Sequence, residues 1–224
     1  MTSSDEKPVS APRPVLSPDE RRQRQRERER LLARLVYETD AAGKPIYYAD
    51  YQQVLTKNAE PESIMGSSAL QSYLVNIMQA FLYDHPLRKH FFYLASELGV
   101  QIGRKKWRSC DIAIYERERL KDYTFTNKYM SLPPDFVIEI DTKADLTKYT
   151  YQHDYFLEKT RQLHEFGVKK VVWIFTENHP VIWESDSADT ITIHQSWDVA
   201  ITITEGMIFN LTRLIEVDKN NEVA

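Results

Sequence analysis

Acidic side chains alternate with apolar ones in the segment from residue 135 to residue 143. Asp135, Glu139, Asp141 and Lys143 share one face if this segment is extended throughout, because successive side chains of a strand point to opposite faces. Carboxylate oxygens are the ligands that hard divalent cations prefer. The pattern is compatible with a functional carboxylate cluster, and also with a half-exposed strand whose polar face meets water.

A lysine interrupts the apolar face of the helix predicted for residues 151–166. Phe156 and other apolar residues recur at helical spacing around Lys159, so this side chain belongs to the face that packs on the sheet. The ammonium group either extends past the edge of that face to water or points toward Glu139 and Asp141. The spacing leaves both interpretations open.

A further aspartate, Asp111, opens the β-prone run DIAIY at residues 111–115. It comes shortly after the basic run RKKWR at residues 104–108, which suits phosphate contacts or a solvated loop. An aspartate at the start of a strand is often a turn or capping residue. Asp111 therefore has a functional role only if its strand is a neighbour of the strand at residues 136–143.

The segment 134–176 predicts a strand–helix–strand unit. A β-rich run at 136–140 precedes the predicted helix, which ends at Gly167, and the apolar run KKVVWIF at 169–175 follows. At this spacing we expect the two strands to be parallel, with a right-handed crossover.

The remaining elements indicate an α/β domain. Residues 69–83 predict an amphipathic helix with Ser67 or Ser68 as its N-cap. Short strands are predicted at 92–94, 100–102, 111–115, 181–183, 191–193 and 200–203. Together these elements predict a mixed β-sheet flanked by helices.

Composition divides the chain into four parts. Residues 1–18, rich in Pro, Ser and charge, predict a disordered tail. Residues 19–42 predict a charged helix and linker, which is either a solvated lead into the domain or a basic arm on nucleic acid. Residues 43–215 form the predicted domain, and residues 216–224 a C-terminal tail.

The overall composition narrows the class of protein. The 224 residues, 42% of them hydrophobic, suffice for one core, and no apolar run is long enough to span a bilayer. A single cysteine and an N-terminus without an apolar signal segment lead us to expect a cytoplasmic protein. The net charge of −4 means that any nucleic-acid surface must be local. The six histidines lack close metal-ligand spacing, which argues against a histidine zinc site.

Three segments, taken in order, resemble one known family. The runs DIAIY, PPDFVIEIDTKAD and LEKTRQLHEFGVKKVVWIF are similar to the restriction endonuclease family often called the Uma domain family, within the PD-(D/E)XK nuclease superfamily. The run SIMGSSALQ at 63–71 resembles the entry into the first helix in part of that family, and the similarity covers residues 45–212. The resemblance implies a restriction-endonuclease-like fold.

The resemblance also implies a divalent-metal site. Asp111 matches the family's first aspartate, Glu139 its second acid and Lys159 its helix lysine. The generic signature has a lysine two residues after the acid, where this chain has Asp141. Either the lysine role has moved to Lys159, or the acid is Asp141 with Lys143 in register. We prefer Glu139 with Asp141 assisting.

The expected function is a metal-dependent endonuclease that hydrolyses DNA phosphodiester bonds. Asp111, Glu139 and Asp141 would bind Mg²⁺ or Mn²⁺, and Lys159 or Lys143 would assist. A homodimer is the simplest way to cut both strands. The alternative is a catalytically inactive protein of nuclease fold that binds nucleic acid or protein, and a third interpretation is an interaction protein that acts through the charged helix.

Overall fold

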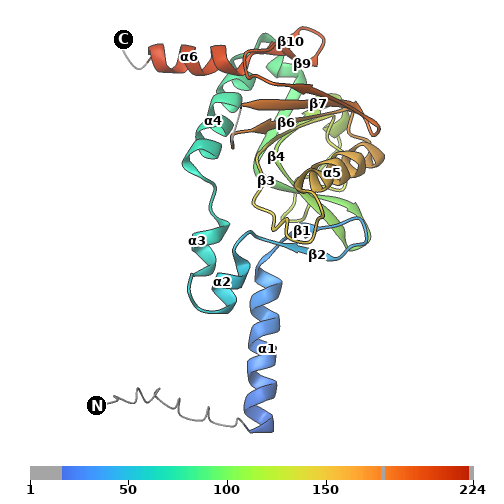
Figure 1. Cartoon of the computed structure of the whole chain (residues 1–224). Helices are drawn as coiled ribbons and strands as arrows, with labels where there is room; N and C mark the ends of the chain where they lie inside the picture. Colours follow the sequence, from blue (N-terminus) through green and yellow to red (C-terminus); the bar gives the residue numbers. More distant parts are fainter. Residues whose placement is uncertain (1–16, 178–179, 222–224) are drawn as a thin grey trace, which may run out of the picture. The chain divides into compact units, whose positions relative to one another are not determined.

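The computed structural model describes residues 17–177 and 180–221, and a six-stranded mixed sheet lies at its centre (Figure 1). Its strands lie in the order β3-β4-β5-β6-β7-β8, with β5 and β6 parallel and the other neighbours antiparallel. Their bounds are β3 Phe91–Gly103, β4 Lys106–Glu116, β5 Phe136–Ile140, β6 Lys170–Phe175, β7 Val181–Ser187 and β8 Thr190–His194. The predicted mixed sheet flanked by helices is confirmed.

The strand–helix–strand unit is present as predicted. Helix α5, Gln152–Phe166, connects β5 to β6 and ends at Gly167, whose φ of 119° suits a residue without a side chain. The register of the two parallel strands pairs Glu139 with Trp173. This unit fixes where Glu139 lies relative to α5.

Helices cover both faces of the sheet (Figure 1). Helix α4, Ala69–Asp84, begins at the predicted N-cap Ser68, whose side chain accepts a hydrogen bond from the backbone N–H of Gln71. Its buried side chains pack with those of one sheet face, including Leu74, Met78, Ile138 and Ile140. Those of α5 pack with the other face, including Tyr155, Leu163, Val137 and Trp173.

Because β5 is covered on both sides, its alternating side chains are buried in two different cores. Ile138 and Ile140 lie in the core beneath α4, whereas Val137 lies in the core beneath α5. Glu139 has the parity of Val137 and is only 1% exposed. The half-exposed strand considered from the sequence is therefore wrong, because every residue of β5 is buried.

Strand β3 differs from the two short strands predicted at 92–94 and 100–102. It is one long strand, interrupted where Ser96 and Glu97 take positive φ values of 71° and 57°. The register with β4 shifts at this point, between Ala95 and Leu98. The interruption is a β-bulge, and a bulge disturbs the alternation of side chains, so the sequence pattern predicts two strands in place of one.

The strand predicted at 200–203 belongs to a smaller sheet. Strand β9, Ile201–Thr204, pairs with β10, Met207–Phe209, and helix α6, Leu211–Asn221, follows. Helix α6 continues past residue 216, where the C-terminal tail was expected to begin. The hydroxyl of Tyr73 on α4 donates to Asp218 on α6 at 2.9 Å.

The compact unit starts at Leu35, ahead of the boundary expected at residue 43. Strand β1, Val36–Thr39, pairs antiparallel with β2, Pro45–Tyr47, and carries the buried residues Tyr37 and Glu38. The expected linker therefore supplies part of the core. The remaining short helices are α2 Tyr51–Leu55, α3 Pro61–Met65, η1 Pro86–His90 and η2 Arg117–Leu120.

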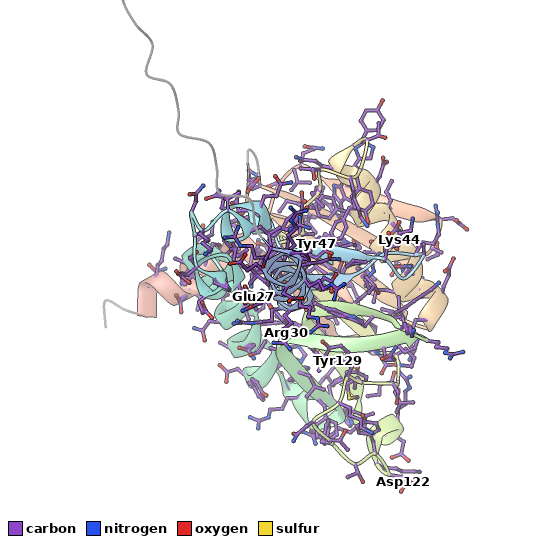
Figure 2. The ribbon with its side chains drawn as sticks, turned by 90° about the horizontal axis from the view of Figure 1, so that it is seen from below. Glu27, Arg30, Lys44, Tyr47, Asp122 and Tyr129 are labelled. Carbon is purple, nitrogen blue, oxygen red and sulfur yellow. The ribbon has the colours of Figure 1, made fainter. Side chains whose placement is uncertain are left out.

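Helix α1, Pro18–Arg34, lies outside this compact unit and has no buried residue. Ser17 and Glu20 cap its N-terminus reciprocally through side chain and backbone. Its polar side chains, Glu27 and Arg30 among them, project around the helix axis (Figure 2). The tail predicted for residues 1–18 falls almost entirely outside the described residues. Among the described helices, none is long and apolar enough to cross a membrane.

Candidate active site

Glu139 and Lys159 meet in the layer between the sheet and α5. The ammonium nitrogen of Lys159 lies 3.1 Å from Oε1 of Glu139, and the two side chains are 0% and 2% exposed. These two atoms are close but not aligned for a hydrogen bond, so each lacks a hydrogen-bond partner among the described residues. The lysine on the apolar face of α5 therefore points inward, toward the predicted acid.

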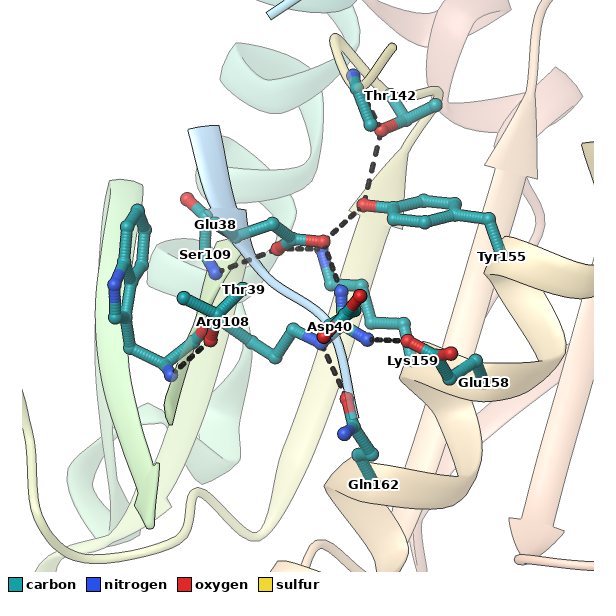
Figure 3. A network of polar contacts seen from close by, with 12 residues as sticks. Glu38, Thr39, Asp40, Arg108, Ser109, Thr142, Tyr155, Glu158, Lys159 and Gln162 are labelled. Atoms are coloured by element: carbon teal, nitrogen blue, oxygen red, sulfur yellow. Dashed lines mark hydrogen bonds and ion pairs between the residues drawn. The ribbon is translucent and has the colours of Figure 1, made fainter. Parts of the chain in front are cut away.

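Lys159 also faces a second buried carboxylate, that of Glu38. Its ammonium nitrogen lies 3.5 Å from Oε2 of Glu38 on β1. Figure 3 shows that Glu38 is held by several donors from the surrounding elements. Arg108 Nη1 donates to it at 2.6 Å, the Tyr155 hydroxyl at 2.5 Å and the Ser109 backbone N–H at 3.1 Å. Glu38 is thus a fixed anion beside Lys159.

Asp111 joins the site from β4, the strand next to β5. The antiparallel register pairs Ile112 with Ile138, which brings Asp111 level with Glu139. Its Oδ2 accepts a hydrogen bond of 2.7 Å from the backbone N–H of Ile140. Backbone N–H groups of a strand lie in the plane of the sheet, so this carboxylate lies at the junction of β4 and β5. The condition that gave Asp111 a functional interpretation, that its strand neighbours β5, is met.

The pKa values of the buried acids shift in different directions because the charges around them differ. Burial, followed by the negative charge of Asp111, raises the pKa of Glu139 to about 8, although Lys159 opposes the shift. Burial likewise raises the pKa of Asp111, against the hydrogen bond from Ile140. Burial alone would also raise the pKa of Glu38, but Lys159 and Arg108 hold that pKa below its ordinary value. Glu38 is therefore the ionised partner, and Glu139 keeps its proton near neutral pH.

The cluster holds more acidic than basic groups. Among the described residues, two cations, Lys159 and Arg108, interact electrostatically with four carboxylates, those of Glu38, Asp111, Glu139 and Glu158. Water screens Glu158, which is 28% exposed, but the other three acids are buried. Protonation of Glu139 relieves part of this excess, and a bound cation would relieve it in the same way.

Asp141 does not continue the alternation of β5. The strand ends at Ile140, and Asp141 takes a positive φ of 54°, which turns the chain away. Its Oδ1 accepts the backbone N–H of Thr176 at 2.7 Å, and its Oδ2 accepts the Thr176 hydroxyl at 2.5 Å. Both carboxylate oxygens therefore already bind the chain that leaves β6.

Lys143 is likewise separated from Glu139 by the end of the strand. Its ammonium group forms an ion pair with Glu97 at the β3 bulge and donates to the carbonyl of Met65 at 3.3 Å. Burial lowers the pKa of Lys143. The shared face was expected on the condition that the strand persists to residue 143, and the structure does not meet this condition because β5 ends at Ile140. Of the two candidate lysines, the structure brings Lys159 to Glu139.

The residues present fit a hard divalent cation. Asp111 lies level with Glu139 on the neighbouring strand and interacts with it electrostatically. Asp111 and the main-chain carbonyl of Ile140 share one donor, the side-chain amide of Gln71. Among the described residues, Oε1 of Glu139 is a buried oxygen without a hydrogen-bond partner. In residues 17–177 and 180–221, no group of three or more His, Cys, Asp or Glu side chains is arranged to hold a metal. Mg²⁺ is commonly held by one or two carboxylates with water completing its coordination, so a pair of acids with a carbonyl suffices.

Several residues of this cluster were not predicted from the sequence. Glu38 lies in the expected linker, where a single acid in a short strand carries no signal. Arg108 ends the basic run assigned to a solvated loop or phosphate contacts, but it is 0% exposed and ion-paired with Glu38 and Glu158. Only the β-prone run VYET at 36–39 could have indicated that Glu38 lies in a strand.

Comparisons with known proteins find similarity to solved structures. No protein-family model matches the chain, and no curated protein matches it. The fold is similar to a crystal structure described as "a putative nuclease belonging to DUF820" from Anabaena variabilis ATCC 29413, with a TM-score of 0.49 and 14% sequence identity. The match covers 68% of this chain and 83% of that one.

Proposed function

We propose that this protein is a metal-dependent nuclease that hydrolyses DNA phosphodiester bonds. Asp111 and Glu139 hold Mg²⁺ or Mn²⁺ together with the carbonyl of Ile140, and Lys159 assists. The proposal follows the resemblance of three chain segments to a restriction endonuclease family. Asp141 has a supporting role at the end of β5, because Thr176 occupies both of its carboxylate oxygens.

One observation carries the proposal. Lys159 of the crossover helix lies beside Glu139, and Asp111 on the adjacent strand accepts the backbone N–H of Ile140, so two acids and a lysine are buried near the end of β5 although the sheet is covered on both faces. A buried carboxylate is unfavourable unless it is paired, protonated or bound to a cation. In a purely structural core, well-packed apolar residues at these positions are often as stable or more stable. Such a cluster is therefore a candidate for function.

The residues of the chain have distinct roles in this proposal. A divalent cation held by these residues would supply Lewis-acid chemistry, which polarises a phosphate and lowers the pKa of a coordinated water. Asp111 and Glu139 supply the negative oxygens that hold it, and Glu139 must release its proton to do so. The ammonium group of Lys159 provides a fixed positive charge beside Glu139, suited to stabilising negative charge that develops on the phosphate. Glu38 holds Lys159 in place from the other side.

The second candidate function is a catalytically inactive protein of the same fold that binds nucleic acid or protein. The burial of the site favours this alternative, since Glu139 is 1% and Lys159 0% exposed. Phosphodiester hydrolysis requires access of substrate to these groups. DNA binding without cleavage, in the presence of either cation, would support the alternative.

The test is cleavage of plasmid and linear duplex DNA with Mg²⁺, with Mn²⁺ or with EDTA. Glu139→Gln should abolish cleavage while keeping the fold, because the amide resembles the protonated acid. Glu184→Gln is the matched control, since Glu184 is a partly buried strand glutamate paired with Lys170 away from the site. We expect the control to cleave like the natural protein. Undiminished cleavage by Glu139→Gln would disprove the assignment.

A further inference from the structure

The side-chain amide of Gln71 contacts two of the groups of the candidate metal site, Asp111 and the carbonyl of Ile140. Its Nε2 donates to the carbonyl oxygen of Ile140 at 2.9 Å. The same nitrogen lies 3.3 Å from Oδ1 and 3.4 Å from Oδ2 of Asp111. Gln71 is 5% exposed, so these contacts are shielded from water.

The partners of this amide are the oxygens that would bind a cation. An amide NH₂ group has two donors and no formal charge, so it can satisfy a carboxylate and a carbonyl at once. It therefore takes the role of a cation toward Asp111 and Ile140, but without neutralising the charge.

We infer that Gln71 is an internal gate of the metal site, whose amide occupies the cation position and must withdraw before a divalent cation binds. This inference rests on the proposed function, because it assumes that Asp111 and Glu139 are the metal ligands. It adds a competition between a side chain of the protein and the cation. Metal binding is then weaker than the oxygens of the site alone would give.

The position of Gln71 in α4 allows this movement. It lies in the first turn of the helix, and residues 66–70 just before it are exposed. Its backbone N–H is held by the side chain of Ser68, so the helix start stays in place while the side chain rotates. The side chain of Gln71 thus connects the solvent-exposed start of α4 with the buried carboxylate of Asp111.

The test is a titration of the metal-free protein with Mn²⁺ by calorimetry, together with thermal unfolding in EDTA. Gln71→Ala should unfold at a lower temperature than the natural protein in EDTA, because Asp111 loses its donor. It should bind Mn²⁺ about fivefold to tenfold more tightly. In the natural protein, Mn²⁺ must displace the amide of Gln71, which costs the net free energy of about one hydrogen bond, and in the variant this cost is absent. Gln79→Ala, the same change further along α4, should match the natural protein in both measurements.

Each outcome has a defined meaning. If the natural protein binds Mn²⁺ and Gln71→Ala binds it equally or more weakly, the gate is disproved while the metal site stands. If neither binds Mn²⁺, the metal site and the gate are both wrong. Gln71→Ser, which keeps a polar group but leaves the position open, should show the same tightening and replaces the alanine variant if that variant does not fold.

Discussion

The ammonium group of Lys159, on α5, lies 3.1 Å from Oε1 of Glu139, on β5, and both side chains are sealed from water. Helix α5 thus places a positive charge near the end of β5, the strand that precedes it in the chain. The same lysine lies between Glu139 and Glu38, which ties the candidate site to the β1–β2 hairpin. Lys159 therefore links the stability of the core to the charge of the candidate site.

Loss of the buried lysine should strongly destabilise the protein. Lys159→Met leaves Glu38 and Glu139 with one cation fewer, and removal of one partner of a buried pair costs about 3 to 5 kcal/mol. The decrease in the free energy of unfolding should be smaller at pH 6 than at pH 8.5, because Glu139 is neutral when it is protonated. Urea unfolding at both pH values measures this decrease. Lys121→Met, which breaks the exposed pair with Glu118, should change stability by about 0.5 kcal/mol or less. Equal effects of the two variants would contradict the prediction.

The stability of the metal-free protein should depend on pH through Glu139. The folded protein holds this proton up to about pH 8, whereas an unfolded glutamate releases it near 4.5. Between these values the folded state binds more protons, so stability falls as pH rises, by up to about 1.4 kcal/mol per pH unit. Urea unfolding in EDTA from pH 5 to pH 8 should show that Glu139→Gln loses this contribution. Identical slopes for variant and natural protein would show that Glu139 titrates normally.

The hydroxyl of Tyr155 should contribute measurably to stability. It donates to Glu38 at 2.5 Å inside the core, and a hydrogen bond to a charged group contributes about 1.5 to 3 kcal/mol. Tyr155→Phe should lower the free energy of unfolding by that amount in chemical denaturation. Tyr83→Phe removes a hydroxyl from a half-exposed tyrosine and serves as the control. A neutral result for Tyr155→Phe would mean that Glu38 does not depend on this donor.

Asp111 and Asp141 should respond differently to Mn²⁺. Asp111→Asn removes a ligand charge, so Mn²⁺ should no longer raise the thermal midpoint. Asp141→Asn should keep most of the Mn²⁺ shift, because the natural side chain is bound to Thr176. Thermal unfolding with and without Mn²⁺ compares the two. A complete loss of the shift in Asp141→Asn would identify Asp141 as a ligand as well.

Much of the architecture was predictable from local patterns. The apolar spacing of α4 with its cap at Ser68 and the strand–helix–strand unit ending at Gly167 each depend on a short stretch of chain. Their physical signals are periodic burial and terminal hydrogen bonds, which are local. The inward direction of Lys159 remained open because a lysine at that position can also reach water. The bulge in β3 was not predicted, because a residue with positive φ inside a strand has no consistent sequence signal.

By itself, the sequence determined the mixed α/β sheet flanked by helices and placed Asp111, Glu139 and Lys159 on elements that could meet. The tertiary structure decided which groups do meet. It ended β5 at Ile140, so that Asp141 and Lys143 turned to other partners, and it brought Glu38 and Gln71 into the site from distant segments. The reason is physical: periodicity specifies the face of an element, whereas charge pairing in a core depends on which elements pack together.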